Sequence, residues 1–327
     1  MEIRFESSEC NGEELVKNFE KDFETSSLIE AEYSEFKEGV TGTVKEIHLN
    51  NAFVLCQDYK NTNTECYTLK VSHNHPVFLL QFSMEGGLSF FSNHSPDKKF
   101  ILNKNAYNLF FIPASTYTYN YHSDKKHFLN IYFTESYLLS KMGFCFIRSL
   151  KKYQKAKKEN NLSALFDDGL ILNAKLRNIV NEFLNCSFDG MTRQSYLESK
   201  LTELVLTALM STPSKKDSNK LRNEEIEALT NIENYIQNHL KEELTIEKLS
   251  LKAGFNTSKF KKVFKQVYGM PVFKYITALR IEKAKQLIEE YNYTIAQASY
   301  KVGYKNPQHF TVAFKKKMGY LPSELIK

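Results

Sequence analysis

Two short runs of this chain place hydrogen-bonding and cationic side chains on one side of an amphipathic helix. The runs are GFNTSKFKKVFKQVYG at 254–269 and GYKNPQHFTVAFKKKMG at 303–319. Opposite an apolar stripe, helical spacing aligns Ser258, Lys261, Lys262 and Lys265 in the first run, and Gln308, Thr311, Val312 and Lys315 in the second. In a DNA major groove, Lys pairs with guanine, Gln with adenine, Ser or Thr with several base edges, and Val contacts the thymine methyl group.

We therefore expect these outward positions to contact DNA. The predicted base-reading residues are Ser258, Lys261, Lys262, Gln308, Thr311 and Val312. Neighbouring polar and cationic groups suit the phosphate backbone better, and the predicted phosphate contacts are Lys259, Lys265, Asn306, His309, Lys315, Lys316 and Lys317. Helices that bind only another protein remain the alternative.

Both runs belong to a unit that occurs twice. Residues up to Gly254 recur 49 positions later and residues from Phe260 onward recur 50 positions later, so the second turn has one extra residue. Thr245 and Thr294 are predicted N-caps, and Thr294 with Gln297 fits a capping box. Each half is thus predicted to be two short helices joined by a glycine-containing turn, the helix-turn-helix arrangement.

A single helix is predicted between the two units, over residues 272–291. Its 20 residues would span about 30 Å, close to the ~34 Å of one turn of B-DNA. A spacer of this length could set two recognition helices in successive major grooves. One chain would then read two different half-sites, and its target need not be palindromic.

Residues 222–327 resemble the DNA-binding domain of AraC/XylS-type transcription regulators. The matching stretches are TIEKLSLKAGFNTSKFKKVFKQVYGMPVFKYITALRIEKAKQLI and TIAQASYKVGYKNPQHFTVAFKKKMGYLP. The resemblance places the base contacts on the six residues named above, and it implies RNA polymerase as a partner. Many relatives carry Arg where this chain has Val312, so base reading by the second unit is expected to be weaker or directed at thymine.

The part of the chain before residue 135 is predicted to be rich in β-strands. Its apolar and β-branched runs include TGTVKEIHL, AFVLCQDY, CYTLKVSH, VFLLQFSM, LSFFSN, YNLFFIP and HFLNIYF, and turn signals MEGG, SNHSPD and NKNA separate some of them. This pattern predicts an antiparallel barrel or sandwich, and a small barrel can hold one small ligand. The family resemblance likewise implies a sensing or dimerising domain here, often cupin-like.

Two helices are predicted next, over 173–186 and 193–210, each with an apolar stripe. The stripes could pack on the barrel or form a two-fold dimer interface. QSYLESKLTELVLTALM is similar to the dimerisation segment of siderophore-responsive members of the family. The run STPSKKDSNK at 211–220 is polar and charged and is predicted to be a linker.

The net charge of +6 is concentrated at the C-terminal end. Residues 223–327 hold 17 Lys and Arg against 11 Asp and Glu, and from Phe255 onward the balance is 14 against 4. Such asymmetry is typical of a nucleic-acid-binding region. The chain lacks an N-terminal apolar segment and any apolar run of about 18 residues, so we expect a cytoplasmic protein.

Enzyme and metal chemistry are disfavoured by the residue pattern. Five scattered cysteines without a C-x-x-C pair predict reduced structural thiols. The HNH at 73–75 resembles the H-x-H of metal-binding cupins, but the next acidic residue is Glu85 and Pro76 follows at once. No nucleophile elbow, P-loop or dinucleotide fingerprint is present. A cupin-type enzyme, or a methyl-accepting repair protein with a zinc-thiolate cluster, is the enzymatic alternative.

The sequence therefore predicts an α+β chain: an N-terminal antiparallel β barrel, cupin-like, with a following helix pair, and an all-α C-terminal domain with two helix-turn-helix motifs. We expect a β-rich sensor at 1–135, a helical dimerisation segment at 136–210, a linker at 211–221 and a DNA-binding domain at 222–327. The expected function is one-component transcription regulation by a homodimer that responds to a small ligand, without a cofactor or metal. In the alternative interpretation, the N-terminal part serves only in dimerisation or protein binding and does not sense a ligand.

Overall fold

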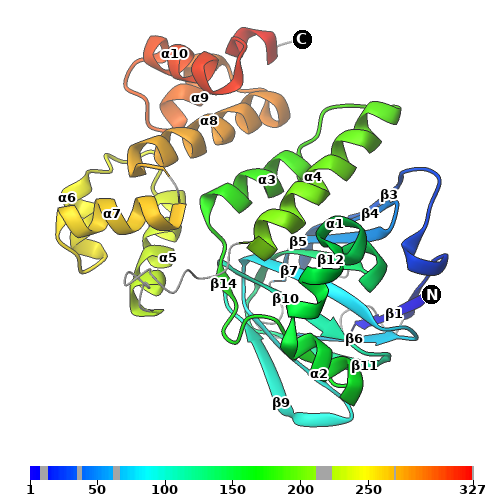
Figure 1. Cartoon of the computed structure of the whole chain (residues 1–327). Coiled ribbons are helices and arrows are strands. Elements are labelled where there is room, and N and C mark those ends of the chain that lie inside the picture. The colour runs from blue at the N-terminus through cyan, green and yellow to red at the C-terminus, as the bar shows by residue number, and fades with distance from the viewer. Residues whose placement is uncertain (8–13, 35–38, 62–66, 211–222, 269, 326–327) are drawn as a thin grey trace. The chain divides into compact units, whose positions relative to one another are not determined.

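The computed structural model describes residues 1–7, 14–34, 39–61, 67–210, 223–268 and 270–325. It divides into two compact units, one over residues 1–172 and 176–212, the other over 213–327 with 173–175. The predicted linker at 211–221 lies outside the described residues. An N-terminal antiparallel β region and a C-terminal helical region are present (Figure 1), which confirms the predicted fold class at that level.

The first unit is built from two antiparallel sheets. The six-stranded sheet has the order β2-β1-β6-β11-β8-β9, with β1 Glu2–Ser7, β2 Glu14–Asn18, β6 Tyr67–His73, β8 Leu88–Ser92, β9 Ser95–Leu102 and β11 Ser115–Tyr121. The second sheet has the order β13-β10-β7-β12-β5-β4-β3, with β14 also paired to β10. Its strands are β3 Ile29–Tyr33, β4 Val40–Leu49, β5 Ala52–Asn61, β7 Val77–Glu85, β10 Ala106–Ile112, β12 Lys125–Phe133, β13 Ser163–Ala164 and β14 Leu170–Ile171.

The two sheets pack face to face as a sandwich. One hydrophobic cluster joins residues of both sheets, including Ile3, Val71 and Tyr119 from the first and Leu55 and Leu79 from the second. Successive side chains of a strand point to opposite faces, so the second sheet has another face to cover. Each of the seven β-runs predicted from the sequence overlaps a strand over its described residues, and the turn signal NKNA contains Asn105 at φ 60° between β9 and β10.

Four helices cover the outer face of the second sheet (Figure 1). They are α1 Glu135–Ser149, α2 Lys151–Glu159, α3 Ala174–Leu184 and α4 Gly190–Met210. The α4 stripe is fully buried in a cluster with strand residues such as Val54 and Leu80. The Tyr107 hydroxyl of β10 also donates a hydrogen bond to the Ala208 carbonyl, at 3.0 Å. The apolar stripe of α4 therefore packs on the sheet of its own chain, the first of the two predicted arrangements.

The second unit is helical. It contains α5 Asn223–Asn238, α6 Ile246–Lys252, α7 Thr257–Tyr268, α8 Val272–Tyr291, α9 Ile295–Lys301, α10 Pro307–Met318 and the 3-10 turn η2 Pro322–Leu325. The predicted helix at 272–291 coincides with α8, which lies between the pair α6–α7 and the pair α9–α10 (Figure 1). The buried cluster of α8, α9 and α10 includes Ala284, Ile288, Ala298, Phe310 and Phe314.

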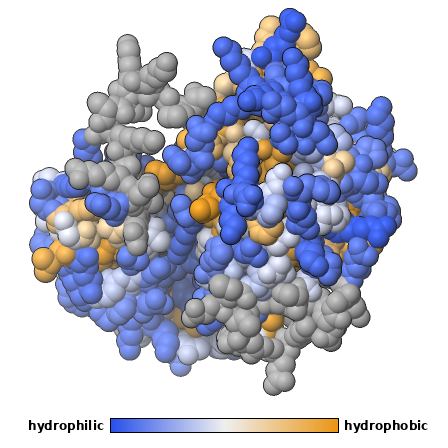
Figure 2. Space-filling view, turned by 90° about the horizontal axis from the view of Figure 1, so that it is seen from below, coloured by the Kyte–Doolittle hydropathy of each residue, from blue (hydrophilic) through white to orange (hydrophobic). Residues whose placement is uncertain are grey.

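The exposed large apolar side chains of the described residues belong to many different elements. In the view of Figure 2, hydrophilic residues cover most of the visible face and hydrophobic residues form small separate groups. Among the described residues of the helical unit, Leu251 and Val312 are the most exposed large apolar residues, at 82% and 68%. Within the described ranges, no helix has the length and hydropathy needed to cross a bilayer.

Candidate nucleic-acid interface

The first helix pair is delimited by residues whose side chains cap its helices. Thr245 Oγ1 accepts a hydrogen bond from the Lys248 amide at 3.2 Å, which starts α6. Asn256 Oδ1 accepts one from the Lys259 amide at 2.8 Å, so Asn256 caps α7. Gly254 lies between the helices at φ 69°, a conformation that costs glycine little.

The second pair repeats this construction. Thr294 and Gln297 form the predicted capping box at the start of α9. Asn306 Oδ1 accepts from the Gln308 amide at 2.7 Å, and Pro307 occupies the first position of α10. Gly303 has φ 94°, and Gly319 ends α10 at φ 87°. The predicted N-caps Thr245 and Thr294 and the predicted capping box are confirmed.

The inner faces of α7 and α10 pack with matching geometry. The rings of Phe260 and Phe264 have centroids 5.6 Å apart and an interplanar angle of 55°. The rings of Phe310 and Phe314, 50 positions later, also lie 5.6 Å apart at 55°. All four side chains are fully buried. Because the two inner faces are fixed in the same way, equivalent positions on the two helices point outward.

The outer face of α7 is cationic. It consists of Ser258, Lys261, Lys262 and Lys265, which are all exposed. None of these three lysines is within ion-pair distance of a carboxylate of the described residues. Their ammonium groups can therefore reach a polyanion without breaking an internal ion pair.

The outer face of α10 is mostly neutral. Gln308, Val312 and Lys315 are exposed. Thr311 is half-buried, and its hydroxyl donates to the Pro307 carbonyl at 3.0 Å, which leaves the hydroxyl oxygen as an acceptor. The structure thus brings the predicted base-reading residues together in two groups of three, one on each helix.

The predicted phosphate contacts have differing surroundings. Lys265, His309, Lys315 and Lys316 are exposed on α7 and α10. Lys317 is exposed and lies 3.8 Å from the Glu282 carboxylate. The Asn306 side chain is already used as a helix cap through its oxygen. Lys259 differs most, because its ammonium lies 2.7 Å from the carboxylate of Glu225 on α5.

Other contacts that shape the helical unit were missed by the sequence reasoning. The buried Glu233 carboxylate of α5 accepts hydrogen bonds from the hydroxyls of Tyr268 and Tyr275, which ties α5 to α7 and α8. Arg280 of α8 bonds two carbonyl groups of the segment that follows α5. For Arg280, the sequence does contain one signal. The residue falls four positions from Ile276 and four from Ala284, so it lies inside the apolar stripe of α8.

A few polar side chains lie inside the β sandwich, among the apolar residues of its core. Strand alternation places Gln57, Gln81 and Asn130 between the sheets. Gln81 Nε2 donates to Asn130 Oδ1 at 2.7 Å, and Asn130 Nδ2 donates to Gln57 Oε1 at 3.1 Å. The Tyr121 hydroxyl donates to the same Gln57 oxygen at 3.3 Å. A hydrogen-bonded row of side chains therefore crosses the middle of the hydrophobic interior.

Several buried side-chain atoms of the sandwich strands have no hydrogen-bond partner among the described residues. They are Gln81 Oε1, the Tyr119 hydroxyl and both ring nitrogens of His73. Burial raises the pKa of Tyr119 and lowers the pKa of His73 to about 3. Buried polar groups are normally hydrogen-bonded, so these atoms are exceptions within the sandwich.

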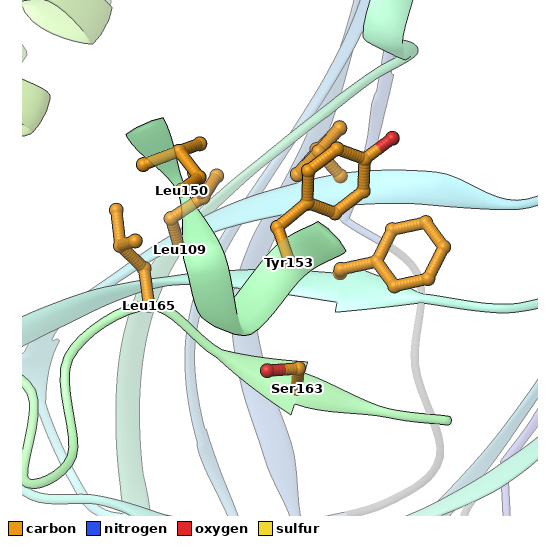
Figure 3. Close-up of a pocket in the computed structure, with 7 residues that line it drawn as sticks. Leu109, Leu150, Tyr153, Ser163 and Leu165 are labelled. Atoms are coloured by element: carbon orange, nitrogen blue, oxygen red, sulfur yellow. The ribbon is translucent and has the colours of Figure 1, made fainter. Parts of the chain in front are cut away.

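An apolar pocket lies between α2 and the outer face of the second sheet (Figure 3). Leu109, Leu150, Tyr153 and Leu165 line it, together with the Ser163 hydroxyl. Its enclosed space is about 10 Å³, close to the least that holds one water molecule. A small-molecule effector needs a much larger site, so this pocket does not fit one as it stands.

The histidines and cysteines of the first unit do not converge. His75 is exposed beside Asn74, and His122 Nε2 lies 2.8 Å from the Ser89 hydroxyl. In the part of the chain that the structure describes, no three His, Cys, Asp or Glu residues gather in a way that could hold a metal ion. Burial raises the pKa of the Cys56 thiol to about 12. Cys10 and Cys66 lie outside the described residues.

Two family models match the chain. The Regulatory protein PchR N-terminal domain matches residues 41–222, and a Helix-turn-helix domain matches residues 249–327. The first match alone covers more than half of the chain.

Similar curated proteins align with the C-terminal part. The probable transcriptional regulator LumQ of Photobacterium leiognathi is 32% identical over 92 residues, which are 28% of this chain and 37% of LumQ. The HTH-type transcriptional regulator YobQ of Bacillus subtilis is 36% identical over 88 residues, 27% of this chain and 36% of YobQ. The chain thus spans little more than a third of the length of these relatives.

Similar solved structures include the C-terminal domain of AraT, a response regulator from Geobacillus stearothermophilus. It is 28% identical, with 33% of this chain and 86% of that chain covered and a TM-score of 0.29. ToxT from Vibrio cholerae is 14% identical, with 91% and 97% covered and a TM-score of 0.29. These TM-scores are low, and the family of the chain is instead shown by the two family models. The chain belongs to the AraC-type DNA-binding transcription regulators, with an N-terminal domain of the regulatory protein PchR family.

Proposed function

We propose that this chain is a sequence-specific, one-component transcription regulator that reads two unlike half-sites on one face of a DNA duplex. The repeated packing of α7 and α10 carries the proposal. Both helices bury a phenylalanine pair of the same geometry and expose the opposite face, yet one exposed face is cationic and the other mostly neutral. Both helix pairs then act as helix-turn-helix motifs, with α8 as the spacer.

The base contacts are assigned to the six residues at the outward positions. Lys261 and Lys262 suit guanine, Gln308 suits adenine, and Val312 suits a thymine methyl group. Ser258 and Thr311 can bond to several base edges. Lys265, His309, Lys315, Lys316 and Lys317 are assigned to phosphates, because they flank these positions and are exposed. Asn306 can add a phosphate contact only through its amide nitrogen, and Lys259 only by leaving Glu225.

A selection experiment tests the DNA proposal. Duplexes bound by the full chain are selected from a random-sequence pool and sequenced. The expected result is two different half-sites whose centres lie about 10–10.5 base pairs apart, one helical turn. Recovery of a single half-site, or of no shared sequence, would contradict reading by both helices.

We also propose that the first unit is a cupin-like sensor for a small ligand. The polar row through the sandwich and the buried Gln81 and Tyr119 atoms without partners among the described residues support a binding site between the sheets. A ligand that prefers one conformation of the chain would shift how the DNA-binding domain is presented. The segment 211–221 connects the two parts in sequence.

Native mass spectrometry of the chain purified from its own host tests the ligand proposal. Tyr119→Phe removes a hydroxyl that has no partner among the described residues, whereas in the control Tyr117→Phe the lost hydroxyl bonds to the Pro113 carbonyl. The expected result is a small molecule that is bound by the wild type and the control and lost from Tyr119→Phe. Equal retention by Tyr119→Phe, or no bound molecule, would count against this site.

The remaining partners follow from the family. RNA polymerase is proposed as the protein partner and the cytoplasm as the location. A homodimer is proposed too, but its contact would use a surface other than the apolar stripe of α4, since that stripe is buried on its own sheet. A methyl-accepting enzyme is disfavoured, because a buried thiol of raised pKa at Cys56 is a poor nucleophile.

A further inference from the structure

The two glycine turns have different surroundings. A Cβ atom built on Gly254 would meet nothing within 4 Å. A Cβ atom on Gly303 would lie 2.5 Å from the Leu240 carbonyl oxygen, 2.9 Å from the Lys241 carbonyl oxygen and 3.0 Å from Arg280 Nη2. The first turn thus needs glycine for its backbone conformation only. The second turn also needs it for a close approach to residues 240–241.

Arg280 bonds to the same segment from α8. Its Nε donates to the Leu240 carbonyl at 2.9 Å and its Nη2 donates to the Glu242 carbonyl at 2.9 Å. The guanidinium is planar and its donors are fixed in direction, so two bonds hold it in one orientation. The segment ends at Thr245, the cap of α6, and the contact therefore reaches the start of the first helix pair.

The contact continues into the second pair. The Arg280 guanidinium lies 5.9 Å from the ring centroid of Tyr304, directly after Gly303. The ring of Tyr304 packs edge-on against Phe310, with centroids 5.4 Å apart. Phe310 belongs to the buried face of α10. A chain of contacts thus runs from residues 240–242 through Arg280 and Tyr304 to α10, beside the covalent path through α8.

We propose that Arg280, Gly303 and the carbonyls of residues 240–242 form a clamp that fixes the distance and phase between α7 and α10, and so sets the half-site spacing that the chain accepts. This inference rests on the proposed reading of DNA by both helices. Arg280 is a positioning residue that does not itself touch DNA. Because the clamp fixes α10 relative to α7, binding of α7 raises the effective concentration of α10 at the second half-site. This gain occurs only when the half-site spacing of the DNA matches the distance between the two helices.

The test measures affinity for a set of duplexes by fluorescence anisotropy with the full chain. One duplex carries the site selected by the wild type, others have one to three base pairs added or removed between the half-sites, and one keeps only the first half-site. The variants are Arg280→Ala, Arg280→Lys and Gly303→Ala. Lys283→Ala controls for a lost charge on α8, because among the described residues Lys283 bonds within its own helix, to Gln286. Gly254→Ala controls for backbone strain, since both glycines have positive φ.

For Arg280→Ala and Gly303→Ala, we expect affinity for the selected duplex to fall about tenfold as the effective concentration drops. Binding to the single half-site should stay within about twofold, and the dependence on spacing should flatten. Arg280→Lys should lie between Arg280→Ala and the wild type, and both controls should keep the wild-type spacing profile.

Two results would overturn the clamp. One is an Arg280→Ala variant that keeps the wild-type spacing profile. The other is an equal loss on the single half-site, which would reveal a general folding defect. A wild type that is itself indifferent to spacing would instead overturn the proposed reading by two helices, together with the clamp that rests on it.

Discussion

Lys259 and Glu225 form an ion pair that joins α7 to α5, with Lys259 Nζ 2.7 Å from Glu225 Oε1. The Glu225 side chain is only 14% exposed. A carboxylate so shielded from water loses more from the removal of its partner than an exposed one does. The pair therefore ties the N-terminal turn of α7 to α5, and the lysine is held back from the outer face.

This pair predicts that Lys259 adds little to the salt dependence of DNA binding. Lys259→Ala should leave the slope of log affinity against log salt close to that of the wild type. Lys265→Ala, one of the exposed lysines of α7, should reduce the slope by about 1, since one phosphate contact is lost. Anisotropy titrations across a salt series measure both. A reduction of about 1 for Lys259→Ala as well would mean that its ammonium leaves Glu225 for a phosphate.

Lys261 and Lys262 are predicted to read bases. Replacing either with Ala should cost about 1–3 kcal/mol on the selected site and relax the preference at one base position. The lost contact is specific, so binding to unrelated duplexes should change much less. Competition assays with single-base variants of the site provide the measurement. A uniform loss on all duplexes, with a shallower salt slope, would make that lysine a phosphate contact.

Val312 offers a test of apolar base reading. Its side chain is 68% exposed on the outer face of α10, where contact with DNA would bury it. Replacing the thymines of the second half-site by uracil, one at a time, removes a methyl group and nothing else. Uracil at the thymine that Val312 contacts should weaken DNA binding by the wild type and leave DNA binding by Val312→Ala unchanged. Equal affinity of the wild type for every uracil duplex would remove the methyl contact.

The helical unit was predictable because its signals are local. The helix predicted at 272–291 coincides with α8, and the predicted caps Thr245 and Thr294 start α6 and α9. The outward positions of α7 followed from the helical period of the sequence. These features depend on residues no more than a few positions apart, and hence a single sequence contains them.

Long-range contacts were not predictable in this way. Nothing near Lys259 in the sequence points to Glu225, and nothing near Gly303 points to Leu240. Strand β11 was also missed, because its STYTYNY sequence is polar throughout. Its tyrosines alternate into the sandwich, while its threonines and asparagine face outward. The choice between packing and dimerisation for α4 likewise depended on strands more than 50 residues away in sequence.

His73 gives the first unit a predictable response to acid. Its imidazole is buried between the rings of Tyr117 and Tyr132, with centroids 6.1 and 5.9 Å away. Neither ring nitrogen has a partner among the described residues. Burial without compensation disfavours the imidazolium and lowers the pKa of His73 from 6.5 to about 3.

The sign of the pH effect follows from these two pKa values. Between pH 6.5 and about pH 3, His73 is protonated in the unfolded chain and neutral in the folded chain. The free energy of unfolding therefore falls as the pH falls through this range, by about 1.4 kcal/mol per pH unit at most. His73→Phe should remove this part of the pH dependence, whereas His75→Ala, at an exposed site two residues away, should keep it. Urea unfolding of the β unit at pH 7, 5.5 and 4.5, followed by tyrosine fluorescence, gives the free energies of unfolding. If wild type and His73→Phe lost stability in parallel between pH 7 and 4.5, the buried imidazole would not be the group that titrates.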